Sequence, residues 1–418
     1  MELSRIFSFL QLFWNFMRQL LLYIISGLLL FSFQFAYADV PKKWTFLIFL
    51  NGDNGLDPDA TQNLLAMEKV GSNDQVNIVV QWASLSAGKT VRLLVKKSTD
   101  PTHVTSPILQ DLGLVDMGNY KNLQDFIQWG VTNFPADHYF VDVWDHGSGW
   151  HLQHNQHFHS KQNTLNDISW DEISGNWITT EQLGSVMTYA ANVMGHRVDV
   201  YGSDACQMAM VEVANEMSTS VDYFAGSEFV EPAASWPYAE FFRHVEARPN
   251  LTADQVSKLL TKEYVRSYEG GSGGRAQVTF SAFQMDKLNR FNTAFKKMSD
   301  EIRTLAPSEK AKVLSAAQNA QQFFENDYRD VGDLLKKLKQ AKITGISKAD
   351  ITEVQFALDE FVIANADTKN FRDSTGLSIW FPVTTNRYNQ YADRYSHLDF
   401  NQATDWNASL NYILQGTH

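Results

Sequence analysis

Residues 138–150, HYFVDVWDHGSGW, join an apolar run to a polar turn and are the most informative stretch for the fold. The run has the continuous hydrophobic and aromatic character of a strand that is buried on both faces, as in a parallel sheet. It stops at Asp145, and His146 and Gly147 follow directly. The sequence therefore predicts a parallel strand that ends just before a histidine.

Residues 198–210, VDVYGSDACQMAM, repeat this arrangement later in the chain. A short apolar strand is predicted over 198–202 and a helix over 208–217, so Cys206 lies between a strand end and a helix start. The carboxyl ends of parallel strands share one edge of a sheet, where ligand sites form. We therefore expect His146 and Cys206 to lie at the same edge.

Other segments of the chain continue the alternation of strand and helix. Buried strands are predicted at 44–50, 76–82 and 91–95, and helices at 60–70, 123–131 and 180–194. This alternation implies an α/β fold with a mostly parallel sheet sandwiched by helices.

From about residue 238 the pattern is mainly helical. A helix is predicted at 253–268, charged helices up to about 364 and a terminal helix at 405–414, with strands at 277–283 and 377–381 and a flexible glycine-rich loop at 270–274. We divide the chain into a leader (1–38), a core (39–245) and a C-terminal helical region (246–418) whose strands complete or flank the core.

A cysteine and a histidine at neighbouring strand ends can form a nucleophilic site. A thiol attacks a carbonyl as its thiolate, and an imidazole takes up the proton and returns it to the leaving group. The backbone N–H groups of Gly147 and Cys206 are the candidate oxyanion donors. Taken singly, Cys206 also fits an inert core residue and His146 a turn residue, but the pair favours catalysis.

Two motifs around these residues resemble those of the clostripain family of cysteine peptidases. Residues 145–150, DHGSGW, resemble its histidine motif, and residues 204–209, DACQMA, followed by Glu212 and Ala214, resemble its cysteine motif. Stretches at 47–71, 170–183 and 279–282 agree, so the likeness covers about residues 44–300. The resemblance implies a caspase-like fold and a thiol protease (a hydrolase acting as an endopeptidase) with Cys206 as nucleophile and His146 as general acid and base.

The same resemblance implies cleavage after arginine or lysine, because acidic residues line the specificity pocket of the family. Asp204 matches one of these acids. Some members carry a second acid in a turn that here reads EPAASW over residues 231–236, with no acid between Pro232 and Trp236. Glu228 and Glu231 are the candidates to take its place.

The family also implies autoprocessing, because its members are often cut between the histidine and the cysteine after a basic residue. Lys161 and Arg197 are the basic residues in this interval. Arg197 adjoins a buried strand, whereas Lys161 lies in a polar loop. We therefore predict that any internal cleavage follows Lys161.

The first 38 residues resemble a signal peptide. An apolar run over 20–35 follows Arg18 and ends in Ala36-Tyr37-Ala38, with small residues at the two positions that signal peptidase reads. A retained membrane anchor is the alternative, because residues 6–17 are also apolar. Cleavage before Asp39 predicts a secreted or periplasmic protein without a stable membrane anchor.

The composition indicates the kind of partner. The formal net charge is −12, from 35 Lys and Arg against 47 Asp and Glu. An acidic surface repels phosphate backbones, so no nucleic acid partner is expected. The expected partner is a peptide or protein substrate.

Two polar clusters leave alternatives open. The histidines at 151, 154, 157 and 159 could bind a metal ion, which would make the protein a metal-dependent hydrolase, or form a solvated loop. Asp53, Asp57 and Asp59 could bind calcium, on which some clostripain-like enzymes depend, or stabilise a helix N-terminus. The spacing is not that of an EF-hand, which favours the helix, so no cofactor is expected to be required. A caspase-like binding protein without activity is the remaining alternative.

Overall fold

The computed structural model describes residues 13–14, 17–19, 41–151, 153–154, 164–165 and 167–415. The chain forms two compact units, Met1–Pro41 and Lys42–His418. In the first unit, residues 13–14 and 17–19 are helical, and the rest of the predicted signal peptide lies outside the described residues. Within the described part of the chain, no helix has the length and apolar character needed to cross a membrane.

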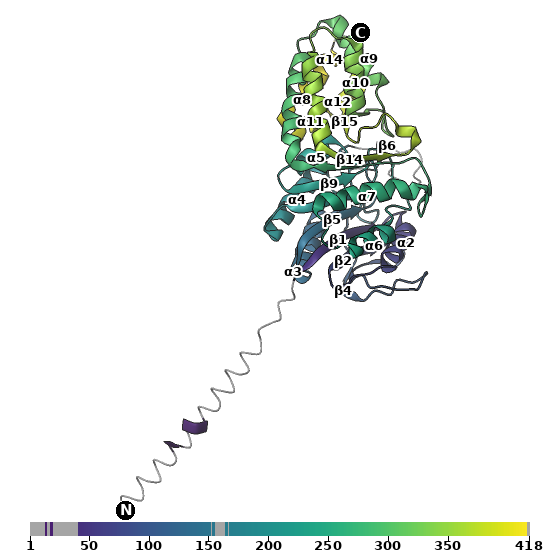
Figure 1. Ribbon diagram of the computed structural model, residues 1–418, viewed down its shortest axis with the longest axis vertical. Helices are drawn as coiled ribbons and strands as arrows, with labels where there is room; N and C mark the ends of the chain where they lie inside the picture. Colours follow the sequence, from purple (N-terminus) through teal and green to yellow (C-terminus); the bar gives the residue numbers. More distant parts are fainter. Residues whose placement is uncertain are drawn as a thin grey trace, which may run out of the picture. The chain divides into compact units, whose positions relative to one another are not determined.

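A nine-stranded sheet forms the centre of the second unit, with the order β14-β12-β9-β8-β5-β1-β2-β3-β4 (Figure 1). The five central strands are parallel, and the outer strands are antiparallel to their neighbours. The strand bounds are β1 Lys42–Gly52, β2 Val76–Ser84, β3 Lys89–Leu94, β4 Ile108–Gly113, β5 Ala136–Trp144, β8 Val198–Asp204, β9 Val221–Gly226, β12 Thr279–Gln284 and β14 Val362–Asp367. The predicted α/β class is confirmed.

Helices cover both faces of the sheet. Successive side chains of each central strand point to opposite faces, so each strand contributes to two separate buried clusters. On β1, Leu47 and Phe49 belong to one buried cluster, whereas Phe46 and Ile48 belong to a second. The first cluster includes side chains of α3 (Tyr120–Asn133), α4 (Thr180–Met194) and α5 (Val211–Glu216), and the second includes those of α2 (Asp57–Glu68), α6 (Tyr238–Ala247) and α7 (Ala253–Tyr268).

The C-terminal helices extend the first cluster, which contains both Leu47 and Leu414. They gather beside the β14 edge of the sheet (Figure 1). Their bounds are α8 Leu288–Ile302, α9 Pro307–Asn319, α10 Val331–Ala341, α11 Lys348–Phe361, α12 Thr385–Tyr395, α13 Asp399–Thr404 and α14 Trp406–Leu414. Small paired strands are β6 Gln153–His154 with β7 Thr164–Leu165, β10 Glu269–Gly271 with β11 Gly274–Arg275, and β13 Tyr328–Asp330 with β15 Ser378–Trp380.

Three main-sheet strands, β4, β9 and β14, were not predicted, and three predicted elements differ in the structure. The helix after Cys206 begins at Val211 rather than 208, because Gln207 has a positive φ of 62° and Met210 is extended and bridges to Ser378. The strand predicted at 377–381 pairs with β13 rather than with the main sheet. The loop at 270–274 is part of a small hairpin, β10–β11.

Candidate active site

His146 and Cys206 follow the ends of two adjacent parallel strands. Trp144 at the end of β5 is in register with Asp204 at the end of β8, and each candidate residue lies two positions further along its chain. The Asp145 N–H donates to the Asp204 carbonyl at 3.2 Å. The structure therefore brings the two loops that carry His146 and Cys206 side by side, as the strand pattern predicted.

Gly147 lies directly against the backbone of the cysteine loop. A Cβ added at this position would be 2.5 Å from the Cys206 carbonyl oxygen and 3.0 Å from the Cys206 nitrogen. Real Cβ atoms essentially never show the first distance and rarely show the second, so the close approach of the two loops requires glycine. The backbone N–H groups of both predicted oxyanion donors thus lie in one small region.

The half-buried thiol of Cys206 contacts the backbone of Glu231. The Glu231 N–H donates to Sγ at 3.2 Å, and the thiol donates to the Glu231 carbonyl at 3.8 Å. Burial raises the pKa of the thiol to about 11, against the opposing effect of the N–H groups of Glu231 and Gly147. Because α5 starts only at Val211, its dipole is less close to the thiol than the predicted helix would have been. The resting thiol is therefore protonated at neutral pH.

His146 is buried, and its ring centroid lies 6.2 Å from that of Trp170. Burial lowers the pKa of the imidazole to about 4. The ring is thus neutral at physiological pH and can accept a proton. A neutral thiol and a neutral imidazole together give a resting state that needs no buried ion pair.

Two asparagines hold the loop that precedes His146, and neither was predicted. Asn51 and Asn54 donate to the two carboxylate oxygens of Asp145 at 2.9 Å and 2.7 Å. Both also donate to the carbonyl of Trp170, at 3.0 Å and 2.8 Å. Both asparagines lie in the stretch NGDNG over 51–55, which is typical of a turn. Their contacts with Asp145 and Trp170 join distant parts of the chain, which a sequence pattern does not reveal.

Asp204 and Glu231 form a buried pair of acids next to the thiol. They share a hydrogen bond, and burial raises the pKa of both, that of Asp204 to about 6. Ser235 donates to Asp204, and the Trp236 indole donates to Glu231 at 3.1 Å. At neutral pH such a pair holds a proton between its two carboxyl groups. The structure thus brings together two of the three acids predicted for the specificity pocket.

Further polar side chains surround this pair. The Tyr238 hydroxyl lies 2.7 Å from Asp204 and 2.8 Å from Asp142, a further buried acid, on β5. The buried Tyr264 hydroxyl, whose pKa is raised by burial and by the charge of Glu231, has no hydrogen-bond partner among the described residues. The pocket therefore retains unsatisfied polar atoms beside the two acids.

Glu228 lies in a different acidic pair. Its carboxyl group accepts a hydrogen bond from Ser374 and shares another with Asp330. Asp330 in turn accepts from the Thr375 N–H at 2.5 Å. This pair joins the end of β9 to the C-terminal region and is separate from the pair of Asp204 and Glu231.

The three aspartates after β1 do not converge on one point. Asp53 and Asp57 are buried, and Asp59 is half-buried. Burial, followed by the charges of Asp171 and Asp57, raises the pKa of Asp53 to about 7. In the part of the chain that the structure describes, no group of three His, Cys, Asp or Glu side chains has a geometry that could hold a metal ion.

Of the four clustered histidines, His151 is fully buried, with Nε2 3.4 Å from an oxygen of Asp327. His154 is described by its backbone in β6 alone. His157, His159 and Lys161 lie outside the described residues. The predicted processing site therefore stays a prediction.

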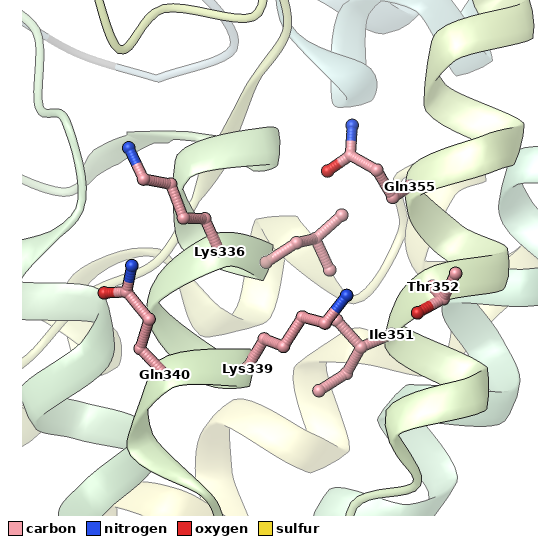
Figure 2. Close-up of a pocket in the computed structure, with 7 residues that line it drawn as sticks. Lys336, Lys339, Gln340, Ile351, Thr352 and Gln355 are labelled. Carbon is pink, nitrogen blue, oxygen red and sulfur yellow. The ribbon is translucent and has the colours of Figure 1, made fainter.

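Cavities lie near the acidic pair and in the C-terminal region. One of about 310 Å³ is bordered by Ser235, Trp236 and Tyr238, whose side chains surround Asp204 and Glu231. Another of about 340 Å³ separates α10 from α11 and is lined by Leu335, Lys336, Lys339, Gln340, Ile351, Thr352 and Gln355 (Figure 2). The first cavity thus shares Ser235, Trp236 and Tyr238 with the surroundings of the acidic pair.

A mostly parallel sheet between helical layers, with a cysteine and a histidine past adjacent strand ends, defines a caspase-like α/β protein. The chain belongs to the clostripain family, whose family model matches residues 48–412. It is therefore a clostripain-like cysteine peptidase, and its substrates are peptides or proteins. The resemblance seen in the two motifs is confirmed.

Solved structures of this family have the same fold. A secreted C11 cysteine protease from Bacteroides thetaiotaomicron, in complex with an irreversible peptide inhibitor, is 17% identical with a TM-score of 0.66, covering 87% of this chain and 99% of that chain. An inactive zymogen C11 protease from Parabacteroides distasonis is 16% identical with a TM-score of 0.67 and the same coverage. No curated protein sequence matches the chain.

Proposed function

We propose that the chain is an exported cysteine endopeptidase that cleaves after lysine or arginine, with Cys206 as nucleophile and His146 as general acid and base. The observation that carries the proposal is the contact of the two strand-end loops, in which Gly147 lies against Cys206 beside a buried acidic pair. Each part of the reaction has a group within this region.

The reaction begins with a neutral thiol. As Sγ bonds to the scissile carbonyl carbon, the thiol proton passes to His146, and the N–H groups of Gly147 and Cys206 stabilise the oxyanion. His146 then protonates the leaving amine as the C–N bond breaks. Water, deprotonated by His146, hydrolyses the thioester and restores the thiol.

The acidic pair supplies the preference for a basic residue. In the empty enzyme, Asp204 and Glu231 share a proton. A lysine or arginine side chain replaces that proton and holds both carboxyl groups ionised, so a buried cation is paired with buried anions. An uncharged side chain leaves the pair as it was and gains nothing from it.

Fluorogenic peptides test this assignment. The purified protein should cleave peptides with lysine or arginine before the scissile bond, with norleucine in the same position as the uncharged comparison. Cys206→Ala and His146→Ala should each abolish cleavage. An active Cys206→Ala protein would refute the thiol mechanism and leave the metal-dependent alternative, which a chelator then tests.

Variants of two glutamates test whether Glu231 belongs to the specificity pocket. Glu231→Gln should reduce the selectivity for lysine over norleucine by about tenfold or more, because it removes one of the two carboxylates that pair with the cation. Glu228→Gln is the control, since Glu228 is another glutamate at this end of the sheet, but its carboxyl group pairs with Asp330. Equal effects of the two substitutions would contradict the proposed pocket.

Export and self-processing complete the proposal. The Bacteroides thetaiotaomicron relative is described as secreted and the Parabacteroides distasonis relative as a zymogen, which supports both steps. The mature chain is expected to start at Asp39, and internal cleavage is expected after Lys161. Mass spectrometry of the exported protein tests both, and a Lys161→Ala protein still cut at that bond would reject the second.

A further inference from the structure

One helix of the C-terminal region contacts both ends of the segment that follows the histidine motif. The chain leaves the active-site edge through Gly147 and His151 and returns at Asp167, beside which Ile168 bridges to Gly147. The helix is α12, and three of its side chains, Arg387, Tyr391 and Arg394, are four and three residues apart. This spacing places them on one face of the helix.

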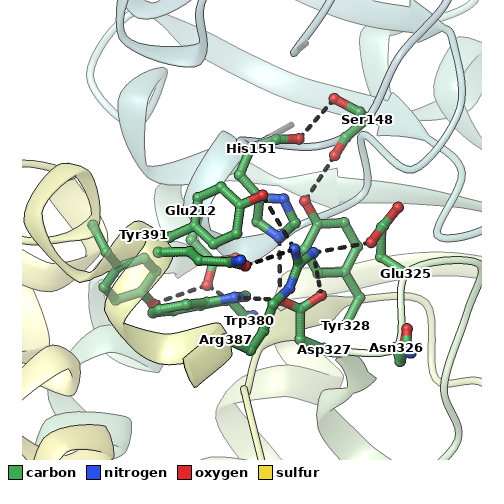
Figure 3. A network of polar contacts seen from close by, with 12 residues as sticks. Ser148, His151, Glu212, Glu325, Asn326, Asp327, Tyr328, Trp380, Arg387 and Tyr391 are labelled. Carbon is green, nitrogen blue, oxygen red and sulfur yellow. Dashed lines mark hydrogen bonds and ion pairs between the residues drawn. The ribbon is translucent and has the colours of Figure 1, made fainter. Parts of the chain in front are cut away.

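The outgoing end of the segment packs on the middle of this face. The ring of His151 stacks on Tyr391, with centroids 4.4 Å apart and planes at 22°. Its Nε2 lies 3.4 Å from Asp327, which accepts from Arg387 at 2.7 Å. Figure 3 shows His151, Asp327 and Arg387 converging in this buried network. Trp150 lies against Tyr395, with ring centroids 5.0 Å apart.

The returning end is held by the last turn of the same helix. Asp167 is fully buried, and its two carboxylate oxygens accept from Arg394 at 3.0 Å and 2.5 Å. Arg394 also donates to Glu181 of α4 at 3.0 Å and 2.6 Å. A bidentate guanidinium group fixes the orientation of the carboxylate as well as its distance.

The two ends are also joined to each other close to His146. The Ser148 N–H donates to the Asp167 carbonyl at 2.8 Å, and the Ser148 hydroxyl donates to the His151 carbonyl at 2.9 Å. The hydroxyl of Tyr328, next to Asp327, donates to the Ser148 carbonyl at 2.7 Å. A displacement of Asp167 or His151 would therefore pass to Ser148, two residues from His146.

We propose that α12 is a positioning helix for the reaction, in which Arg394 and the Arg387–Asp327–His151 chain fix the loop of His146 against Cys206 from both of its ends. This rests on the proposed role of His146 and adds residues that do not touch the substrate. The peptidase would then depend on its C-terminal region for the geometry of its active site.

The test compares two arginines with similar partners. Arg394 joins Asp167 to Glu181, and Arg290 joins Glu353 to Glu360 on the surface of α8 and α11. Arg394→Met should lower kcat by about 10²-fold with KM changed less than threefold, because a misplacement of about 1 Å in the reacting groups costs this much. Arg394→Lys should recover part of the loss, and Arg290→Met should leave kcat unchanged.

A second variant distinguishes loss of positioning from loss of folding. Arg394→Met leaves Asp167 buried without its cation, so the double variant Asp167→Asn/Arg394→Met removes both charges and should fold while kcat stays low. A folded double variant with kcat within threefold of the wild type would overturn the proposal, as would an equal loss in Arg290→Met. If His146→Ala is itself fully active, the role of His146 fails instead, whatever the variants of α12 do.

Discussion

Replacing Gly147 by alanine should lower catalysis while leaving a folded protein. The new Cβ would be 2.5 Å from the Cys206 carbonyl oxygen and 2.9 Å from the Ala205 Cβ. A carbon and a carbonyl oxygen normally approach to about 3.3 Å at the closest. The histidine loop must therefore retreat from the cysteine loop by about 0.8 Å, and His146 and the Gly147 N–H retreat with it.

The size of the effect follows from this displacement. An oxyanion donor works within about 2.7–3.1 Å, and a shift of about 1 Å costs about 10²-fold in rate. We expect kcat to fall by about 10²-fold, or about 2.7 kcal/mol, with a loss of about 1–3 kcal/mol in the free energy of unfolding from the overpacked contact. The φ of Gly147 is not positive, so backbone strain adds nothing.

Steady-state kinetics on a lysine peptide, together with thermal unfolding, measure both quantities. The control is Gly55→Ala, because a Cβ at Gly55 meets no atom within 4 Å. It should leave kcat and stability unchanged. A folded Gly147→Ala enzyme with kcat within threefold of the wild type would show that the two loops need not touch for catalysis.

Three further results are expected. Alkylation of Cys206 by iodoacetamide should accelerate about tenfold per pH unit from pH 7 to 9, because the thiol pKa is about 11; a rate that is flat over this range would indicate a preformed thiolate. The folded pKa of Asp204, about 6, exceeds its unfolded value of 3.8, so its contribution to stability is complete below pH 3.8 and is lost as the pH rises towards 6. Asp204→Asn should therefore gain stability relative to the wild type between pH 4 and 7 in denaturant titrations, and an unchanged difference would contradict the shifted pKa. Activity should persist in EDTA, whereas a loss reversed by calcium alone would support an ion at Asp53 and Asp57.

The strands that carry the site could be predicted because they are buried on both faces. Residues 138–144 and 198–202 lie within the observed β5 and β8, and the histidine and cysteine follow at the predicted edge. The helix predicted at 180–194 is observed as α4, and the structure shows a capping box of Thr179 and Gln182 at its start. Each of these features depends on residues that are close together in the sequence.

The supporting contacts could not be predicted, because they join residues far apart in the sequence. Asp145 is held by Asn51 and Asn54 of the loop after β1, and Asp167 by Arg394 near the C-terminus. No periodic pattern indicates which carboxylate an arginine or an asparagine will reach. The helix predicted after Cys206 was too long for a related reason, since Met210 pairs with distant Ser378 instead of continuing a helical turn.

The electrostatics of the site connect specificity to reactivity. Burial alone makes the thiol a poor acid, and the negative charge of Asp204 raises its pKa further. In the proposed pocket, a substrate cation beside Asp204 and Glu231 would neutralise this charge and so lower the free energy of the thiolate at the moment of attack. Substrate selection should then appear in kcat as well as in KM, since the uncharged norleucine peptide reaches the same thiol without this assistance. In the proposed pocket the same buried acids that reduce the stability of the empty enzyme would bind the basic substrate side chain and, through it, favour the thiolate.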